Sequence, residues 1–305
     1  MHVALVTADA ARALDEDLPP LVEALQAEGV RVSTPSWDAR DVDWSRFDLA
    51  LLRSTWDYVE RLDAFLAWTR RCESETRLLN AADVVAWNVD KHYLANLHSR
   101  GVAVVPTRFV EPGAPAGPAL EAFLGGGAGA LDAGTCLGFS EFVVKPTVGA
   151  GSRDAARYRR DEHARALAHL RRLVEGERRS AMLQPYLGRV DTAGETAVVY
   201  LGGAPSHAIR KGPLLRLDEG LVEGLFAPED IRARAPADDE RAVAAAAYAA
   251  IPFAPPPYAR IDLIRDDAGA PVVLELELAE PSLFFAHAPG AAARLARAVV
   301  VHAQS

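Results

Sequence analysis

Apolar positions follow two alternating spacings over the first eighty residues of the chain. Residues 2–7 and 49–53 are short apolar runs of strand length, whereas residues 18–28 and 60–73 repeat apolar side chains every three or four positions, as amphipathic helices do. Gly29 directly follows the first of these helices and is a typical stop signal. Alternating strands and helices predict a parallel α/β layer, in which ligands gather beyond the carboxyl ends of the strands. Further strands of this layer are expected at 31–37 and 78–80.

The pattern changes after residue 90. Residues 91–100 predict a short helix, and 102–110 a strand interrupted by Pro106. Residues 111–138 predict a Gly-, Ala- and Pro-rich surface connection around a helical ALEAFL at 119–124, and this connection is a candidate hinge. Beyond residue 140, strands come in pairs with helices between them, which predicts an α+β nucleotide module and not a second parallel sheet. The predicted strands are 142–145, 182–186, 195–201, 206–210, 258–265 and 272–278, and the predicted helices are 163–175, 240–250 and 291–303.

Composition and charge exclude several classes of function. The 305 residues carry a formal net charge of −9, which argues against a nucleic-acid binder that must neutralise many phosphates. No apolar stretch is long enough to span a bilayer, and the start, MHVALVTADA, lacks the regions of a secretory signal. The cysteines, Cys72 and Cys136, have no metal-ligand spacing, and no G-x-G-x-x-G motif follows the first strand. We therefore expect a soluble, cytoplasmic, globular protein without a disulfide or zinc framework.

Lysine is rare in this chain. Of the 33 basic residues, 30 are arginine, and the lysines are Lys91, Lys145 and Lys211. A lysine ammonium is a compact point charge for phosphate, whereas arginine offers a planar fork. Lys145 ends a predicted strand and opens the small-residue loop 149–152, whose backbone N–H groups could approach phosphate oxygens. This is not a Walker A loop, because its lysine precedes the glycines, and an ordinary β-turn would explain the same residues.

The last two predicted strands concentrate carboxylates. Arg260 and Asp262 share one face of the first strand, and Glu275 and Glu277 share a face of the returning strand. A turn centred at 268–269 would place Asp262 opposite Glu275 and Arg260 opposite Glu277. Three adjacent carboxylates suit Mg²⁺ or Mn²⁺, but Arg260 and Glu277 could instead form a plain ion pair across the strands. The opposite, core face would hold Ile261, Leu263, Leu274 and Leu276.

Two other segments end strands with polar groups. Residues 184–187 leave a strand end whose backbone could bond an adenine edge, and Asp191 or Glu195 could then hold the ribose hydroxyls. Proline and tyrosine at such a position are equally typical of a turn with a core contact. Arg210 and Lys211 are adjacent cations at the end of another strand, where a solvated basic pair is the alternative.

Taken in order, these motifs resemble the ATP-grasp superfamily of carboxylate ligases over nearly the whole chain. The resemblance implies a fold that combines α/β and α+β parts, with an N-terminal Rossmann-like pre-grasp domain at residues 1–88 for the substrate. A small ATP-grasp subdomain with the phosphate loop would occupy 89–187, and a C-terminal subdomain with the metal site 188–305. Many members carry Asn at the position of Glu277, and the extra charge here would favour two divalent ions.

A narrower resemblance concerns the group that includes D-cycloserine synthetase. It rests on the segments RSTWDY at 53–58, QPYL at 184–187, HAIRKGP at 207–213 and LELELAEPSL at 274–283. The resemblance implies ATP contacts from Lys91, Lys145, Gly149, Ala150, Gly151, Ser152, Gln184, Tyr186, Leu187 and Glu195 or Asp191. It implies that Arg210, Lys211 and Arg260 stabilise the transferring phosphoryl group, and that one or two Mg²⁺ ions, or Mn²⁺, are held by Asp262, Glu275 and Glu277. The implied substrate contacts are Thr7, Arg53, Ser54, Thr55, Tyr58 and Ser282.

The activity that this resemblance implies is ATP-dependent carbon–nitrogen ligation. A carboxylate would be activated as an acyl phosphate and then attacked by nitrogen, which in the cycloserine case belongs to the same molecule and converts O-ureido-D-serine to D-cycloserine, an antibiotic. An intermolecular ligase of the dipeptide or glutathione synthetase kind is one alternative, and a non-catalytic nucleotide-binding regulator is another. The expected partner is a small amino-acid-like substrate, with neither nucleic acid nor membrane, and related ligases commonly form dimers or tetramers.

Overall fold

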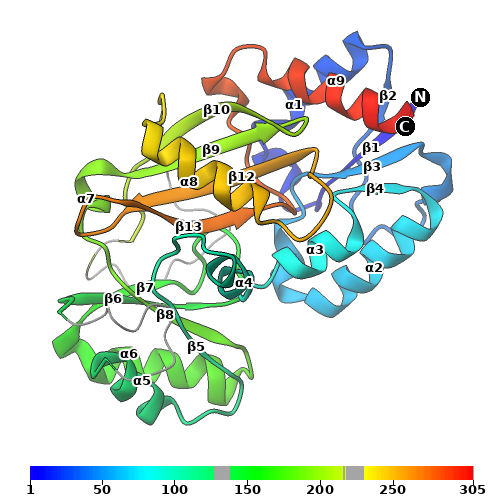
Figure 1. Ribbon diagram of the computed structural model, residues 1–305. Helices are drawn as coiled ribbons and strands as arrows, with labels where there is room; N and C mark the ends of the chain where they lie inside the picture. Colours follow the sequence, from blue (N-terminus) through cyan, green and yellow to red (C-terminus); the bar gives the residue numbers. More distant parts are fainter. Residues whose placement is uncertain (127–137, 216, 218–229, 305) are drawn as a thin grey trace.

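The computed structural model describes residues 1–126, 138–215, 217 and 230–304, and its strands form three sheets (Figure 1). The first sheet is parallel, as predicted, in the order β2-β1-β3-β4. Its central strands are apolar and buried because helices cover both of its faces. The strands are β1 (His2–Val6), β2 (Arg31–Ser33), β3 (Leu49–Leu52) and β4 (Arg77–Leu79), and the helices are α1 (Leu18–Ala27), α2 (Leu62–Glu75) and, from the other end of the chain, α9 (Ala291–Gln304).

The second sheet is antiparallel and has the order β5-β8-β6-β7. Two helices pack against it around a separate apolar core, and one of them lies within the predicted surface connection at 111–138. The predicted helical segment ALEAFL is confirmed, but Leu120 and Phe123 are buried, so this part of the connection does not lie at the surface. Residues 127–137 of the connection lie outside the described residues. The strands are β5 (Arg108–Val110), β6 (Glu141–Pro146), β7 (Ala156–Arg159) and β8 (Ala181–Pro185), and the helices are α5 (Ala116–Leu124) and α6 (His163–Arg171).

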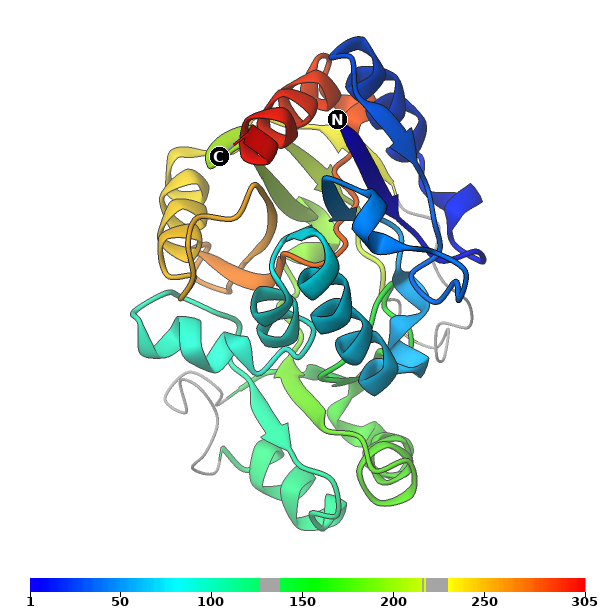
Figure 2. The same cartoon turned by 90° about the vertical axis from the view of Figure 1, so that its right-hand side faces the viewer.

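The third sheet is also antiparallel, in the order β11-β10-β9-β12-β13. In Figure 1 it lies between the other two sheets, and Figure 2 shows the molecule from the side of the first sheet. Helix α4, although it falls in the range expected for the small subdomain, packs with α3 and α8 against this sheet. The strands are β9 (Glu195–Leu201), β10 (Ala204–Lys211), β11 (Ile231–Ala233), β12 (Tyr258–Arg265) and β13 (Pro271–Glu277), and the helices are α3 (Ala82–Asn88), α4 (Tyr93–Ser99) and α8 (Asp238–Ala249). No helix in the described ranges is both long and apolar enough to cross a membrane.

A β-bulge divides the pairing of β12 with β13. Next to the turn, Leu263 lies opposite Val273, so Leu274 is the additional residue on β13. Strand alternation predicted Leu274 on the core face, and this was wrong because the bulge turns its side chain towards a cavity. There Leu274 packs near Ile264 and Leu187.

Gly194 connects the short helix α7 (Val190–Ala193) to β9 in a left-handed conformation, with φ of +72°. A Cβ atom at this position would lie 2.4 Å from the carbonyl oxygen of Lys211, which is backbone and cannot easily yield. We expect Gly194→Ala to lower the free energy of unfolding by about 2 kcal/mol, measured by urea denaturation. Gly117→Ala is the control, since its added Cβ would meet no heavy atom within 4 Å. Equal stability of the two variants would contradict this account.

Candidate functional site

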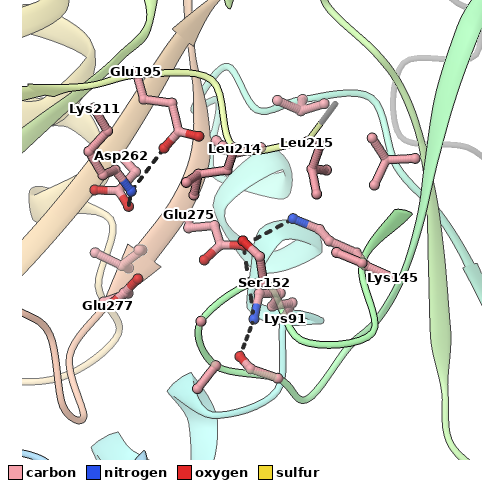
Figure 3. A pocket seen from close by; sticks show the side chains of 18 of the residues that line it. Lys91, Lys145, Ser152, Glu195, Lys211, Leu214, Leu215, Asp262, Glu275 and Glu277 are labelled. Carbon is pink, nitrogen blue, oxygen red and sulfur yellow. Dashed lines mark hydrogen bonds and ion pairs between the residues drawn. The ribbon is translucent and has the colours of Figure 1, made fainter. Parts of the chain in front are cut away.

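A cavity between the second and third sheets collects most of the predicted site residues (Figure 3). Strands β6 and β8 contribute from one side, and β9, β10, β12 and β13 from the other. The predicted residues that line it are Tyr58, Lys91, Lys145, Gly149, Ala150, Gly151, Ser152, Gln184, Tyr186, Leu187, Glu195, Lys211, Arg260, Asp262, Glu275, Glu277 and Ser282.

One end of the cavity is an apolar slot beside the end of β8. Ile264 and Leu274 pack with Leu187 here, and Val143 and residues 184–187 also line the cavity. The Gln184 amide donates a hydrogen bond of 2.9 Å to the Thr107 hydroxyl and is buried. Apolar walls beside a strand end suit a flat purine ring.

Asp191 is not among the residues that line the cavity. Its carboxylate accepts a 3.0 Å hydrogen bond from Arg157, whose guanidinium lies 3.4 Å from the centre of the Tyr186 ring. Glu195, the other predicted ribose acid, lines the cavity and is buried. The structure therefore favours Glu195 over Asp191 as a ligand-facing acid.

Two clusters of opposite charges occupy the middle of the cavity (Figure 3). In one, the Lys211 ammonium lies 2.7 Å from the Asp262 carboxylate and 2.9 Å from that of Glu195. In the other, the Glu275 carboxylate lies 2.9 Å from the Lys145 ammonium and 4.0 Å from that of Lys91. These attractions outweigh the burial of Glu275, which by itself would raise the pKa, and hold the pKa of this carboxyl well below its usual range.

Arg260 binds two of the carboxylates that are candidate metal ligands, Asp262 and Glu277. Its guanidinium donates hydrogen bonds of 2.9 and 3.0 Å to Asp262 and pairs with Glu277 across the strands. The predicted register is confirmed here, since Asp262 lies opposite Glu275 and Arg260 opposite Glu277. Burial, with the carboxylates of Asp262 and Glu275 nearby, raises the pKa of Glu277 to about 7 despite Arg260. The sequence left open whether these residues form a carboxylate cluster or an Arg260–Glu277 ion pair, and the structure contains both.

Lys91 holds the loop at 149–152, which is the candidate phosphate loop. The Lys91 ammonium donates a 2.9 Å hydrogen bond to the carbonyl oxygen of Gly149, and its backbone N–H bonds that of Thr147 at 3.0 Å. Gly151 and Ser152 adopt left-handed conformations, with φ of 62° and 60°. This tight loop brings backbone groups to the cavity wall beside Lys145.

The donor set fits a divalent cation by its chemistry. Asp262, Glu275 and Glu277 offer carboxylate oxygens, which Mg²⁺ prefers, on one wall of the cavity. Within the part of the chain that the structure describes, no three acidic, His or Cys side chains converge on one metal position. Each of these carboxylates instead faces a Lys or Arg. Bound phosphate groups would attract these cations and so leave the carboxylate oxygens free to bind a metal.

Arg210 points away from the cavity. Adjacent residues of a strand face opposite sides, and Lys211 takes the inner side of β10. The Arg210 guanidinium donates hydrogen bonds to the carbonyl oxygens of Ala193 at 2.9 Å and Thr192 at 3.3 Å. This placement contradicts the expectation that Arg210 stabilises the transferring phosphoryl group.

Four predicted substrate contacts also lie outside the cavity. The Thr7 hydroxyl is buried against Pro35 and Arg12, and the fully buried Arg53 pairs with Asp15 at 3.3 Å. The position of these residues after parallel strands suggested a ligand site, but another segment of the chain covers those strand ends. Ser54 and Thr55 are buried, and their hydroxyls have no hydrogen-bond partner among the described residues.

The covering segment is residues 279–284, which we call the clamped loop. Arg53 donates a hydrogen bond of 3.2 Å to its Pro281 carbonyl oxygen, and Arg260 donates one of 3.1 Å to that of Ser282. The Asp17 carboxylate accepts hydrogen bonds from three consecutive backbone N–H groups, at 2.5 to 3.0 Å. Those groups belong to Leu283, Phe284 and Phe285. Arg53 therefore positions this loop and does not itself face the cavity.

Glu280, on the clamped loop, is a cavity residue that the sequence analysis did not assign. It lies within the segment LELELAEPSL, but a strand pattern that ends at 278 gave no reason to select it. Burial and the nearby carboxylate of Glu277 raise the pKa of Glu280 to about 8, although a hydrogen bond with Tyr58 opposes the shift. Trp56 and Phe284 also line this end and were likewise missed.

The raised pKa of Glu280 makes stability depend on pH. The folded protein retains a proton here between about pH 4.5 and 8 that the unfolded chain has lost, so stability falls as the pH rises through this window. Glu280→Gln mimics the protonated form. We expect this variant to melt above the wild type at pH 8 and at an equal temperature at pH 4.5, by thermal denaturation without ligands. A lower melting temperature of the variant at pH 8 would contradict the assignment.

Comparison with known proteins identifies relatives of the whole chain. A family model for the N-terminal domain of D-cycloserine synthetase DcsG matches residues 3–80. The cycloserine biosynthesis protein DcsG of Streptomyces lavendulae is 40% identical over 306 residues, covering 97% of each chain. The crystal structure of D-cycloserine synthetase DcsG matches with a TM-score of 0.90 at 39% identity, over 99% of this chain and 100% of that one.

More distant structures share the fold alone. D-alanine–D-alanine ligase from Bacillus anthracis matches with a TM-score of 0.67 at 13% identity, over 99% of this chain and 96% of its own. The ATP-grasp ligase PsnB, complexed with a minimal precursor, matches with a TM-score of 0.64 at 18% identity and 98% coverage of both chains. These matches confirm the predicted fold. The chain has the ATP-grasp fold and belongs to the D-cycloserine synthetase family, as its motifs predicted.

Proposed function

We propose that this chain is an ATP-dependent ligase that cyclises O-ureido-D-serine to D-cycloserine. The observation that carries the proposal is the combination of a full-length relative in cycloserine biosynthesis with a cavity that gathers all three lysines and the carboxylates of β12 and β13. A regulator that only binds nucleotide does not need this whole set of phosphate and metal contacts.

The apolar slot would receive adenine, with Glu195 near the ribose. Lys91, Lys145 and the loop at 149–152 would contact the phosphates, because their ammonium and N–H groups face the cavity beside the slot. Bound Mg²⁺, held by Asp262, Glu275 and Glu277, would neutralise charge on the phosphates. We infer that ATP draws the lysines from their carboxylate partners as it binds.

Lys211 and Arg260 lie where the acyl phosphate would form. The substrate carboxylate attacks the γ-phosphorus, ADP leaves, and the ureido nitrogen bonded to oxygen then attacks the acyl carbon and expels phosphate. Ring closure and hydrolytic loss of the carbamoyl group give D-cycloserine. The two cations would stabilise the charge that develops on the phosphoryl and acyl oxygens, and Arg260 is already oriented by Asp262.

The proposal is tested by ADP release with Mg-ATP against a substrate panel. The panel contains O-ureido-D-serine, its L-isomer, and amino acids with and without an amine acceptor. We expect ADP release with O-ureido-D-serine alone, together with D-cycloserine. Release only when an acid and an amine are both present would favour an intermolecular ligase, and ATP binding without any release would favour a regulator.

The setting of the enzyme is also part of the proposal. We propose that it works in the cytoplasm, which supplies ATP, with small amino-acid-like molecules as its partners. A dimer or tetramer, as in related ligases, remains an expectation that light scattering of the purified chain would test.

A further inference from the structure

One wall of the cavity is built from two distant parts of the chain. Trp56 and Tyr58 come from the segment after β3, and Glu280, Ser282 and Phe284 come from the clamped loop. The Trp56 indole donates a 3.0 Å hydrogen bond to the carbonyl oxygen of Glu280. The backbone of this wall is thus fixed before any substrate enters.

Glu280 differs from the other carboxylates in the cavity. Asp262 and Glu195 pair with Lys211, Glu275 pairs with Lys145, and Glu277 pairs with Arg260. No comparable ion pair joins Glu280 to a Lys or Arg within the described ranges; its hydrogen-bond partner is the uncharged Tyr58 hydroxyl. The wall therefore offers one carboxylate without a cation of its own, among aromatic rings.

The proposed substrate has the complementary group. O-ureido-D-serine is an α-amino acid, so its carboxylate and its ammonium are attached to the same carbon. The carboxylate must approach Lys211 and Arg260 to be phosphorylated, and the ammonium is repelled by these same cations. Arg260 contacts both the carboxylate cluster and the clamped loop, which brings Glu280 and the reacting region to one end of the cavity.

We propose that the Glu280 carboxylate binds the α-ammonium group of the substrate, with Trp56 and Tyr58 beside it. This inference rests on the proposed function and deepens it, because it assigns the residue that selects an amino acid over an acid of the same length. An ammonium ion between a carboxylate and aromatic faces gains both a charged hydrogen bond and cation–π attraction. Binding would also supply the positive charge that this half-buried carboxyl lacks in the ligand-free protein, and would favour its ionised form.

A cycle of two enzymes and two substrates tests the proposal. The enzymes are the wild type and Glu280→Gln, which keeps the shape of the side chain and removes its charge. The substrates are O-ureido-D-serine and its deamino analogue, 3-(ureidooxy)propanoate. We expect Glu280→Gln to lower kcat/KM for O-ureido-D-serine by about 10- to 100-fold and to leave the deamino analogue within about twofold. An equal loss on both substrates would overturn the proposal, since it would indicate a structural or proton-transfer role.

Two further measurements separate this proposal from other failures. Glu111→Gln is the matched control, because it removes the charge of an exposed carboxylate outside the cavity, and we expect its kcat/KM for O-ureido-D-serine to stay within about twofold of the wild type. Calorimetric binding of D-cycloserine, which retains the amino group, reports on Glu280 without turnover and should weaken at least about tenfold in Glu280→Gln, while ATP affinity stays unchanged. If Glu280→Gln bound D-cycloserine as tightly as the wild type does, the ammonium site would be overturned but the proposed function would not. A wild type that neither turns over O-ureido-D-serine nor binds D-cycloserine would overturn the proposed function as well.

Discussion

Glu275→Gln will lower the rate of ADP release by about three orders of magnitude with saturating substrates. Glu275 is the carboxylate that lies between Lys145 and Lys91, and it faces Asp262 across β12 and β13. Its removal takes away both a candidate metal ligand and the group that holds two phosphate-binding lysines in place. The change is isosteric, so the expected loss arises from charge and not from packing.

A coupled assay for ADP measures this loss, and calorimetry shows whether the variant still binds ATP. Glu111→Gln is the matched control, because this carboxylate is exposed, lies outside the cavity and pairs only with His92 and Ser180 in the described structure. Undiminished ADP production by Glu275→Gln would show that the metal assignment is wrong. A regulator would at most lose some affinity for nucleotide.

Arg53→Met will lower the free energy of unfolding by about 4 kcal/mol. The Arg53 side chain is fully buried, and its loss leaves the carboxylates of Asp15 and Asp17, also buried, without their cation. The Pro281 carbonyl oxygen loses its hydrogen bond as well. The expected effect is large because an uncompensated buried charge costs far more than the pair contributes.

Urea denaturation measures the change, and Arg61→Met provides the comparison. Arg61 is partly exposed and pairs with Asp38 and Asp57 at the surface, so its loss should cost below about 1 kcal/mol. Equal stability of the two variants, together with a higher KM for the amino acid in Arg53→Met, would restore Arg53 as a substrate contact.

The sequence predicted which site residues lie next to one another better than it predicted which side chains reach the cavity. Alternation along β12 and β13 placed Asp262 and Glu275 together, because the side chains of a strand repeat every two residues. The same rule failed at Leu274, where a bulge adds a residue that no local pattern announces. Alternation also separates Arg210 from Lys211, which the sequence-based prediction had grouped as adjacent cations at a strand end.

Other features required the tertiary structure. Residues 53–55 follow a parallel strand, as ligand-binding residues often do, but the clamped loop covers them from a position over 200 residues later. Strands β7 and β11 escaped prediction, since each is only three or four residues long and carries arginines. Glu280 lay beyond the last predicted strand, and only the cavity shows that it faces inwards.

The packing of α9 on α1 has a consequence for cooperativity. One continuous apolar core joins the first sheet, through Val3 and Leu5, to β9 and α9, through Val199 and Leu295. The second sheet has a core of its own, which includes Phe142 and Leu170. The two ends of the chain should therefore melt together as one unit, while the second sheet can open separately and give its amides faster hydrogen exchange.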